Sequence, residues 1–192
     1  FEIANQTTDE TFYAEALDGT CKTATPTLVF VEVSPIPNPP VISDTTRCGL
    51  GTATLTANQN VNWFSNAGLT NLVALNSTSI TTPILQDTTT YYGQTQLGNC
   101  TSNTVEATVN VNVKPNLNGL LSTTICSGET AILTASSNAS DINWYADTTG
   151  SSVVNNGNLF EITPGSDINY YAKATLNSCA SDWKTFSVTV NP

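Results

Sequence analysis

Five cysteines and a lack of histidine define the chemistry open to this chain of 192 residues. Three of the cysteines follow an aromatic pair at a spacing of 79 residues. The recurring cassettes are Phe12-Tyr13 with Cys21, Tyr91-Tyr92 with Cys100, and Tyr170-Tyr171 with Cys179. Cys48 and Cys126 stand at a second shared position. No Cys-x-x-Cys motif occurs, so the cysteines predict a disulfide framework formed in an oxidising compartment. By count alone, the pairs Cys48–Cys100 and Cys126–Cys179 are a natural choice.

Acid–base and nucleophilic chemistry lacks its usual groups. Histidine, the commonest general base and metal ligand, is absent. Asp9-Glu10 is the only adjacent pair of carboxylates, whereas acid–base catalysis requires two carboxyl groups that converge in a pocket. Serine and threonine abound without a histidine to activate them. We therefore expect no enzyme activity, no cofactor and no metal site.

The net charge of -10 restricts the classes of partner. The five basic residues are scattered, so no basic patch is predicted for nucleic acid or for an anionic membrane surface. No segment approaches the roughly 20 apolar residues of a transmembrane helix, so we expect no membrane insertion. Charged residues make up 10% of the chain, and Thr, Ser and Asn supply the polar surface, which suits β-structure.

Period-2 alternation of apolar residues predicts short strands that position these side chains. Residues 53–57 and 105–111 alternate in this way. Turn signals such as Gly98-Asn99 and Asn156-Gly157 separate the strands. About seven short strands in each repeat predict an all-β sandwich.

Two whole repeats align from end to end, and a partial one precedes them. We predict domains at 1–33, 34–113 and 114–192, the first being the C-terminal remnant of a truncated module. Residues 35–40 are rich in proline and predict a stiff, extended linker. The remnant lacks its facing sheet, so we expect that it cannot fold alone.

The tryptophans fall into two kinds. Trp63 and Trp144 occupy the same position in their repeats and predict the core tryptophan of a sandwich, with sugar stacking as the alternative. Trp183 has threonine at both counterpart positions, Thr25 and Thr104, so the module does not require it. It is a candidate surface contact for a ligand or a neighbour, with local packing as the alternative.

The order of these motifs resembles an immunoglobulin domain. Residues 128–135, then Trp144, then residues 167–172 are similar to strand B, the strand-C tryptophan and strand F. Cys-x-Gly before strand B, Asp-Thr-Thr-Thr-Tyr-Tyr at 87–92 and Gly-Asn-Cys after strand F resemble a narrower family. These are the immunoglobulin-like repeats of large secreted Bacteroidetes surface proteins, including adhesins of the gliding type exported by type IX secretion.

This resemblance implies tandem immunoglobulin-like sandwiches in a head-to-tail rod, located outside the cell at its surface. It implies a structural segment of an adhesin or filament involved in gliding motility. The segment would act as a stiff spacer and in weak multivalent adhesion to polysaccharide or solid surfaces, with neighbouring repeats of the same protein as partners. The alternative is a set of spacer or carbohydrate-binding modules in a secreted multidomain hydrolase.

Asp-Thr-Thr occurs at 44–46, 87–89 and 147–149 and resembles the O-glycosylation signal of exported Bacteroidetes proteins. The candidate acceptors are Thr45, Thr88 and Thr148. A hydroxyl-rich turn that satisfies its own backbone is the alternative.

The immunoglobulin topology also implies a disulfide pairing. In it Cys126 precedes strand B and Cys179 follows strand F, at opposite ends of the sandwich. An eight-residue strand spans roughly 26 Å, whereas bridged Cα atoms lie within about 7 Å. Pairing within one repeat is therefore out of reach, and we predict that Cys48 bonds Cys179 across the two whole repeats. Cys21, Cys100 and Cys126 would then have partners in modules outside this chain.

Overall fold

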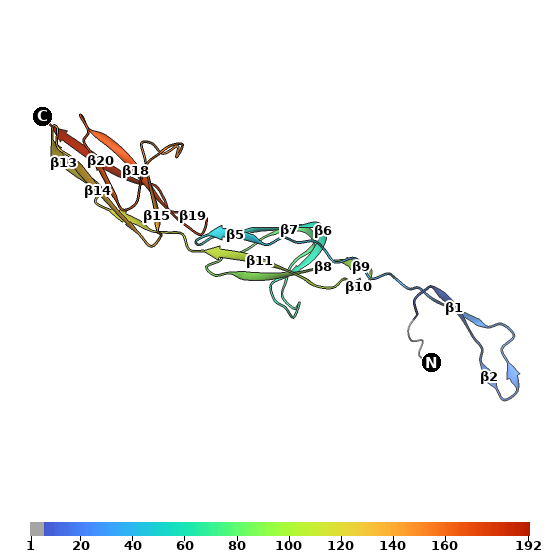
Figure 1. Ribbon diagram of the computed structural model, residues 1–192. Helices are drawn as coiled ribbons and strands as arrows, with labels where there is room; N and C mark the ends of the chain where they lie inside the picture. The colour runs from blue at the N-terminus through green and yellow to red at the C-terminus, as the bar shows by residue number, and fades with distance from the viewer. Residues whose placement is uncertain (1–5) are drawn as a thin grey trace. The chain divides into compact units, whose positions relative to one another are not determined.

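The computed structural model describes residues 6–192. Its regular secondary structure within these residues consists of β-strands alone (Figure 1). The described part therefore has no helix that could cross a membrane. Residues 1–5 of the predicted remnant lie outside the described residues. The chain divides into two compact units. One runs to Ile42 and includes Thr56–Ile80 and Tyr91–Glu106, and the other consists of Ser43–Leu55, Thr81–Thr90 and Ala107–Pro192.

The second unit contains a complete sandwich of two sheets built from the C-terminal repeat. The three-stranded sheet has the order β12-β14-β17, and the larger sheet has the order β13-β20-β18-β15-β16, with β19 paired to β18. The strands are β12 (Leu117–Gly119), β13 (Ser122–Cys126), β14 (Ala131–Ser137), β15 (Asp141–Tyr145), β16 (Val153–Asn156), β17 (Leu159–Ile162), β18 (Ile168–Leu176), β19 (Cys179–Ala180) and β20 (Lys184–Asn191). Because β13 and β20 are parallel while the other pairs are antiparallel, the topology is that of an immunoglobulin sandwich, as predicted.

Trp144 forms the centre of this core, as its position in the repeat predicts. Its side chain is fully buried, with ring centroids of Phe186 and Phe160 at 4.7 and 5.6 Å. The indole Nε1 donates to the Gly157 carbonyl at 2.9 Å, so the one polar atom of this buried side chain has a hydrogen-bond partner. Ala172 lies opposite Trp144 on the neighbouring strand, and its small side chain leaves room for the ring.

The first whole repeat forms a five-stranded sheet of order β5-β11-β8-β6-β7. Its strands are β5 (Thr45–Cys48), β6 (Thr54–Phe64), β7 (Leu72–Thr81), β8 (Thr89–Gln94) and β11 (Val105–Asn112), with a small hairpin of β9 (Gln96–Leu97) and β10 (Cys100–Thr101). Within it β5 runs parallel to β11, which matches the parallel pair of the other repeat. Trp63 is fully buried opposite Gly93 and donates from Nε1 to the Ser77 carbonyl at 3.0 Å.

One strand of this repeat differs from the prediction. Alternation predicts one strand at 53–57, and the resemblance places Trp63 in the following strand C, but β6 runs through both positions without a break. The reason lies in the connection. From Ala57 to Asn62 the chain advances five positions, whereas the equivalent step from Ala135 to Asn143 takes eight. The connection from Ala57 to Asn62 is too short to form a loop, so the chain stays extended.

The described part of the predicted remnant consists of two antiparallel pairs. β1 (Glu10–Ala14) pairs with β4 (Thr27–Val31), and β2 (Leu17–Asp18) pairs with β3 (Cys21–Lys22). Large apolar side chains on the β1–β4 pair are exposed, because no second sheet within residues 6–192 covers them. Tyr13, Leu28 and Phe30 each expose more than 60% of their surface.

Candidate functional site: the Cys48–Cys179 junction

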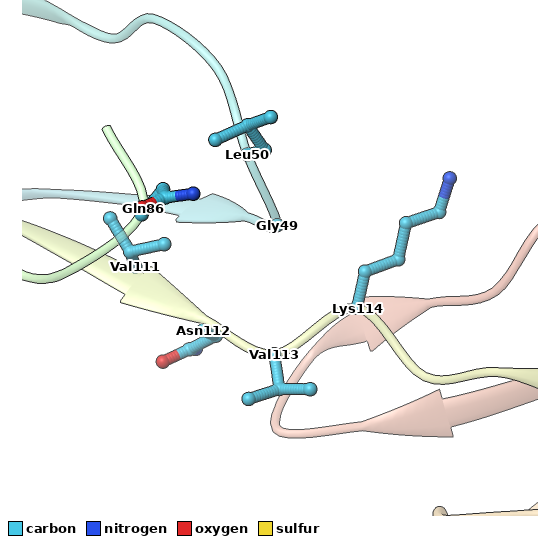
Figure 2. Close-up of a pocket in the computed structure, with 7 residues that line it drawn as sticks. All are labelled: Gly49, Leu50, Gln86, Val111, Asn112, Val113 and Lys114. Carbon is cyan, nitrogen blue, oxygen red and sulfur yellow. The ribbon is translucent and has the colours of Figure 1, made fainter. Parts of the chain in front are cut away.

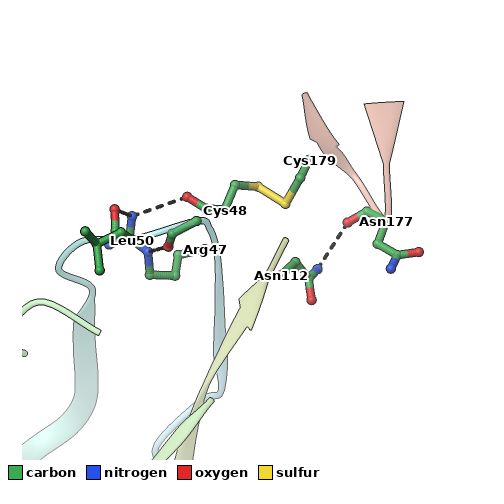
Figure 3. Close-up of a disulfide and its surroundings, with 7 residues drawn as sticks. Arg47, Cys48, Leu50, Asn112, Asn177 and Cys179 are labelled. Atoms are coloured by element: carbon green, nitrogen blue, oxygen red, sulfur yellow. Dashed lines mark hydrogen bonds between the residues drawn. A yellow bond between two sulfur atoms is a disulfide. The ribbon is translucent and has the colours of Figure 1, made fainter. Parts of the chain in front are cut away.

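The structure contains the predicted disulfide between Cys48 and Cys179, with an Sγ–Sγ distance of 2.04 Å and a Cα–Cα distance of 5.5 Å (Figure 3). Cys48 is the last residue of β5, and Cys179 is the first of β19. Cys179 follows the two-residue turn Asn177-Ser178, in which both residues have left-handed φ angles of 48° and 65°. The alternative pairs within one repeat, Cys48–Cys100 and Cys126–Cys179, do not form. We call this disulfide, together with the contacts of Arg47, Asn112 and Lys114 around it, the junction.

Arg47 fixes the loop that leaves Cys48. Its guanidinium donates four hydrogen bonds to carbonyl oxygens of the loop. Two of the acceptors, Cys48 and Leu50, are labelled in Figure 3. The acceptors are Gly49 (2.8 Å), Thr52 (2.6 Å), Leu50 (2.7 Å) and Cys48 (3.3 Å). Charge-assisted bonds of this kind are stronger than neutral ones, so they hold the Cys48 backbone in place.

Gly51 makes the Arg47 arrangement feasible. Its φ of 149° favours glycine, and a Cβ there would lie 2.7 Å from the Arg47 Cζ. Sequence reasoning missed this cluster, because it treated Arg47 as one of several scattered basic residues. The signal was present in the sequence as an arginine directly before a cysteine and a loop with two glycines.

Asn112 connects both sides of the disulfide. Its backbone carbonyl accepts from the Gly49 N–H at 2.8 Å, and its side-chain Nδ2 donates to the Asn177 carbonyl at 3.1 Å (Figure 3). One residue at the end of β11 thus contacts the loop after Cys48 and the turn before Cys179.

Lys114 adds an ion pair to the junction. Its Nζ lies 2.6 Å from the Asp182 carboxylate in a solvent-exposed setting. The hydrogen bond and the positive charge of Lys114 hold the pKa of Asp182 below its ordinary value, and Lys173 adds a smaller contribution. The carboxylate is therefore ionised over a wider pH range than an isolated aspartate.

A pocket of about 310 Å³ lies at the loop that follows Cys48 (Figure 2). It is lined by Gly49, Leu50, Gln86, Val111, Asn112, Val113 and Lys114. The lining offers two amides and one amine but no carboxylate, so it lacks the converging pair that acid–base hydrolysis requires. Within residues 6–192, no three Cys, Asp or Glu side chains gather as metal ligands.

A Ser-x-x-Lys spacing at Ser181 and Lys184 escaped the sequence analysis. In the structure the Ser181 hydroxyl is buried, accepts from the Ala174 N–H at 3.0 Å and donates to the Asp182 carbonyl at 2.8 Å. These contacts give the hydroxyl a structural role in the β18–β19 hairpin.

The remaining cysteines are thiols. Cys21 and Cys126 are exposed, while Cys100 is half-buried with its Sγ 3.6 Å from the Ser34 carbonyl oxygen. Their predicted partners are cysteines of further repeats.

Trp183 is half-buried rather than free. Its ring makes an edge contact with Tyr145 at 5.0 Å between centroids, and the Lys173 Nζ lies 4.6 Å above it. A Cβ placed on Gly150 would lie 3.5 Å from the indole, so the turn at Gly150 also lies against it.

The three candidate threonines occupy different settings. Thr88 and Thr148 are exposed, whereas Thr45 is half-buried in β5. The Thr88 hydroxyl accepts from the Val111 N–H at 3.1 Å. Beside Thr148, Asp147 accepts from the Thr149 backbone and hydroxyl, and these hydrogen bonds hold the pKa of Asp147 below its ordinary value. The turn at Asp147 therefore satisfies its own backbone, whereas the Thr88 hydroxyl satisfies the backbone of the neighbouring strand β11.

Immunoglobulin-like sandwiches in tandem, with a disulfide that joins them, define the class of this protein. The chain belongs to the family of CHU_C-associated Ig-like domains, whose model matches residues 37–115 and 113–192. The comparison with curated proteins finds no match.

Several solved structures are similar to this chain at low sequence identity. The fibronectin(III)-like modules of CbhA from Clostridium thermocellum are 13% identical, with a TM-score of 0.44 over 78% of this chain and 90% of that one. The Ig1-2 module of the Drosophila receptor protein tyrosine phosphatase DLAR is 15% identical, with a TM-score of 0.33 over 81% of this chain and 100% of that one. The insect immune protein hemolin is 13% identical, with a TM-score of 0.41 over 94% of this chain and 56% of that one.

Proposed function

We propose that this chain is a structural segment of an extracellular bacterial surface adhesin or filament, in which it acts as a stiff spacer. The Cys48–Cys179 disulfide carries the proposal, because it joins the two matched repeats covalently at a second point besides the connecting chain. Two covalent connections restrict the rotation of one repeat against the next far more than one does. A structural disulfide also fits an oxidising, extracellular compartment.

Non-covalent contacts at the junction support the same role. Arg47 holds the loop after Cys48, and Asn112 contacts the turn before Cys179. Lys114, in the connection between the matched repeats, pairs with Asp182. These contacts oppose bending at the point where a flexible linker would otherwise stand.

The parent protein is, in this proposal, an adhesin of the gliding type in Bacteroidetes, exported by type IX secretion and held at the cell surface. Neighbouring repeats of the same protein are its partners. The half-buried Trp183, or glycans on the exposed Thr88 and Thr148, provide weak contacts with polysaccharide or solid surfaces that gain strength through repetition. Thr45 is the least accessible of the three candidate acceptors, because it lies half-buried in a strand.

Spacer or carbohydrate-binding modules of a secreted hydrolase remain the second candidate. A carbohydrate platform would use an aromatic row shared by the repeats. Trp183 has no aromatic counterpart at Thr104, and its ring already packs against Tyr145 and Lys173. A spacer function is therefore better supported than carbohydrate binding.

Single-molecule energy transfer tests the stiffness that the proposal requires. Dyes are attached through non-natural amino acids at Ala67 and Gly165, which are exposed loop positions in the two repeats. We expect a narrow distance distribution in the oxidised protein and a broad one in the Cys48→Ser/Cys179→Ser variant. The Cys21→Ser variant serves as the control and should keep the narrow distribution. An equally broad distribution in the oxidised protein would overturn the proposal.

A further inference from the structure

The five cysteines occupy two structural positions. Cys48 and Cys126 are each the last residue of the strand that pairs in parallel with the final strand of its repeat, and we call them end cysteines. Cys21, Cys100 and Cys179 each follow the two-residue turn of a short hairpin, and we call them tip cysteines. The one disulfide joins an end cysteine of one repeat to the tip cysteine of the next.

The backbone around Cys126 reproduces that around Cys48. Cys126 lies opposite Asn191 in the parallel register, as Cys48 lies opposite Asn112. The N–H of the following residue donates to that asparagine's carbonyl at 2.8 Å in both repeats. The loop after Cys126 is held by Glu129, whose carboxylate accepts from the Cys126 N–H at 2.9 Å. An exposed thiol therefore stands in the geometry that is bonded at Cys48.

The tip position is also reproduced. Cys100 follows the turn Gly98-Asn99 and pairs with Leu97, as Cys179 follows its own turn and pairs with Leu176. A buried serine braces each hairpin in the same way. Ser102 Oγ accepts from the Thr95 N–H and Ser181 Oγ from the Ala174 N–H, both at 3.0 Å.

We infer that Cys126 forms a disulfide with the tip cysteine of a following repeat, and that Cys100 bonds the end cysteine of a preceding one. This inference rests on the proposed function, because it requires further repeats of the same kind. A low-molecular-weight disulfide such as oxidised glutathione is the oxidant. One cysteine thiolate attacks it and releases a first glutathione thiolate. The second cysteine thiolate then displaces the other glutathione, so two thiols and one disulfide become one disulfide and two thiols.

With this pairing, the loops closed by successive disulfides overlap along an array of repeats. Consider the shortest covalent path along the array. From an end cysteine it crosses the disulfide to the tip cysteine of the next repeat. It then follows the backbone from that tip cysteine to the end cysteine of the repeat after it. That stretch corresponds to Cys100–Cys126, a separation of 26 residues. Fully extended it spans about 9 nm, and it occurs once in every two repeats. Such an array resists extension even when its repeats unfold, whereas pairing within repeats would leave the stretch in every repeat.

A chain extended by one repeat tests the inference. A second copy of residues 114–192 is joined after Pro192, which occupies the position of Val113 in the 79-residue period. After refolding in a glutathione buffer, free thiols are alkylated and disulfide-linked peptides are mapped by mass spectrometry. We expect Cys126 to be bonded to the appended copy of Cys179, while Cys21, Cys100 and the appended copy of Cys126 are alkylated.

The matched control carries Cys179→Ser in the appended copy only, and there Cys126 should be alkylated. Alkylation of Cys126 in the parent extended chain would overturn the inference, and so would a bond from Cys126 to Cys100 or to its own copy. The energy-transfer experiment uses the unextended chain and depends on Cys48–Cys179 alone. A failure of this inference is therefore distinguishable from a failure of the spacer function.

Discussion

Asp182 is the residue through which pH acts on the junction. Its pKa is lowered in the folded protein, chiefly by the hydrogen bond and charge of Lys114. The ion pair therefore contributes its stability in full above the ordinary aspartate pKa of 3.8. The contribution is lost as the pH falls through the lowered folded value. The carboxylate is exposed, so the contribution is small and is screened by salt.

The Asp182→Asn variant should remove this pH dependence. The wild type should unfold at a slightly higher temperature than the variant at neutral pH and low salt. The difference should shrink to nothing as the pH falls through the lowered pKa of Asp182 and the carboxylate is protonated. Thermal unfolding followed by circular dichroism at a series of pH values measures both proteins. A difference that persists unchanged in acid would show that Asp182 acts through something other than its charge.

Single residues differ in how far the sequence predicts them. Trp63 and Trp144 were predictable as core residues, because both recur at one position of the repeat and a core needs a large side chain there. Arg47 was not, because its role depends on a loop that curls back around its guanidinium. Lys114 and Asp182 lie 68 residues apart, and only the fold brings them together.

At the scale of elements, Gly119 allows β12 to lie close to β14 and to the Phe186 ring of the facing sheet. A Cβ at this position would meet the Thr134 carbonyl oxygen and would lie 2.7 Å from Cε1 of Phe186, which is itself fully buried. Neither the neighbouring backbone nor a packed ring moves easily. The side chain of alanine would therefore push β12 away from β14.

We expect Gly119→Ala to lower the free energy of unfolding by about 1–3 kcal/mol, the usual range for an overpacked core. Gly165→Ala is the matched control, because no atom lies within 4 Å of its added Cβ. It should change the free energy by less than about 0.5 kcal/mol. Urea unfolding followed by tryptophan fluorescence measures both. Equal stability of the two variants would mean that β12 is not held at this distance in solution.

Strand positions followed from period-2 alternation wherever one face of a strand is buried. β11 alternates between buried and less buried positions and was predicted for this reason. β14 was predicted from the resemblance of residues 128–135 to strand B. The continuous β6 was not predicted, because the alternation at 53–57 says nothing of the connection to Trp63. The difference in spacing between Ala57–Asn62 and Ala135–Asn143 was the available signal.

At the scale of the whole molecule, the cysteine pairing was predictable from strand direction rather than from sequence distance. The bonded cysteines are separated by 131 residues, and a choice by proximity or by count would have joined other pairs. The immunoglobulin topology sets an end cysteine and a tip cysteine of one repeat at opposite ends of its sandwich. The end cysteine meets the tip cysteine of the next repeat instead, and the Cα atoms of Cys48 and Cys179 lie 5.5 Å apart.

The same separation makes a mechanical prediction. When the oxidised protein is pulled from its two termini, the load crosses from Cys48 to Cys179 and bypasses the chain between them. Trp63 and Trp144, which form the centres of both cores, lie in the bypassed part. Removal of the bond by Cys48→Ser/Cys179→Ser should release the 131 residues of this loop. The fully unfolded chain should then be longer by about 45 nm.

Force spectroscopy in the absence of reductant measures this length, with Cys21→Ser as the variant that should leave it unchanged. Addition of a reductant to the wild type should reproduce the longer chain. Equal lengths for the oxidised wild type and the double variant would mean that the load does not pass through the bond. The expected result would show that the disulfide shields both tryptophan-centred cores from tension. A spacer under load would then keep most of its chain unstretched even after its sheets have separated.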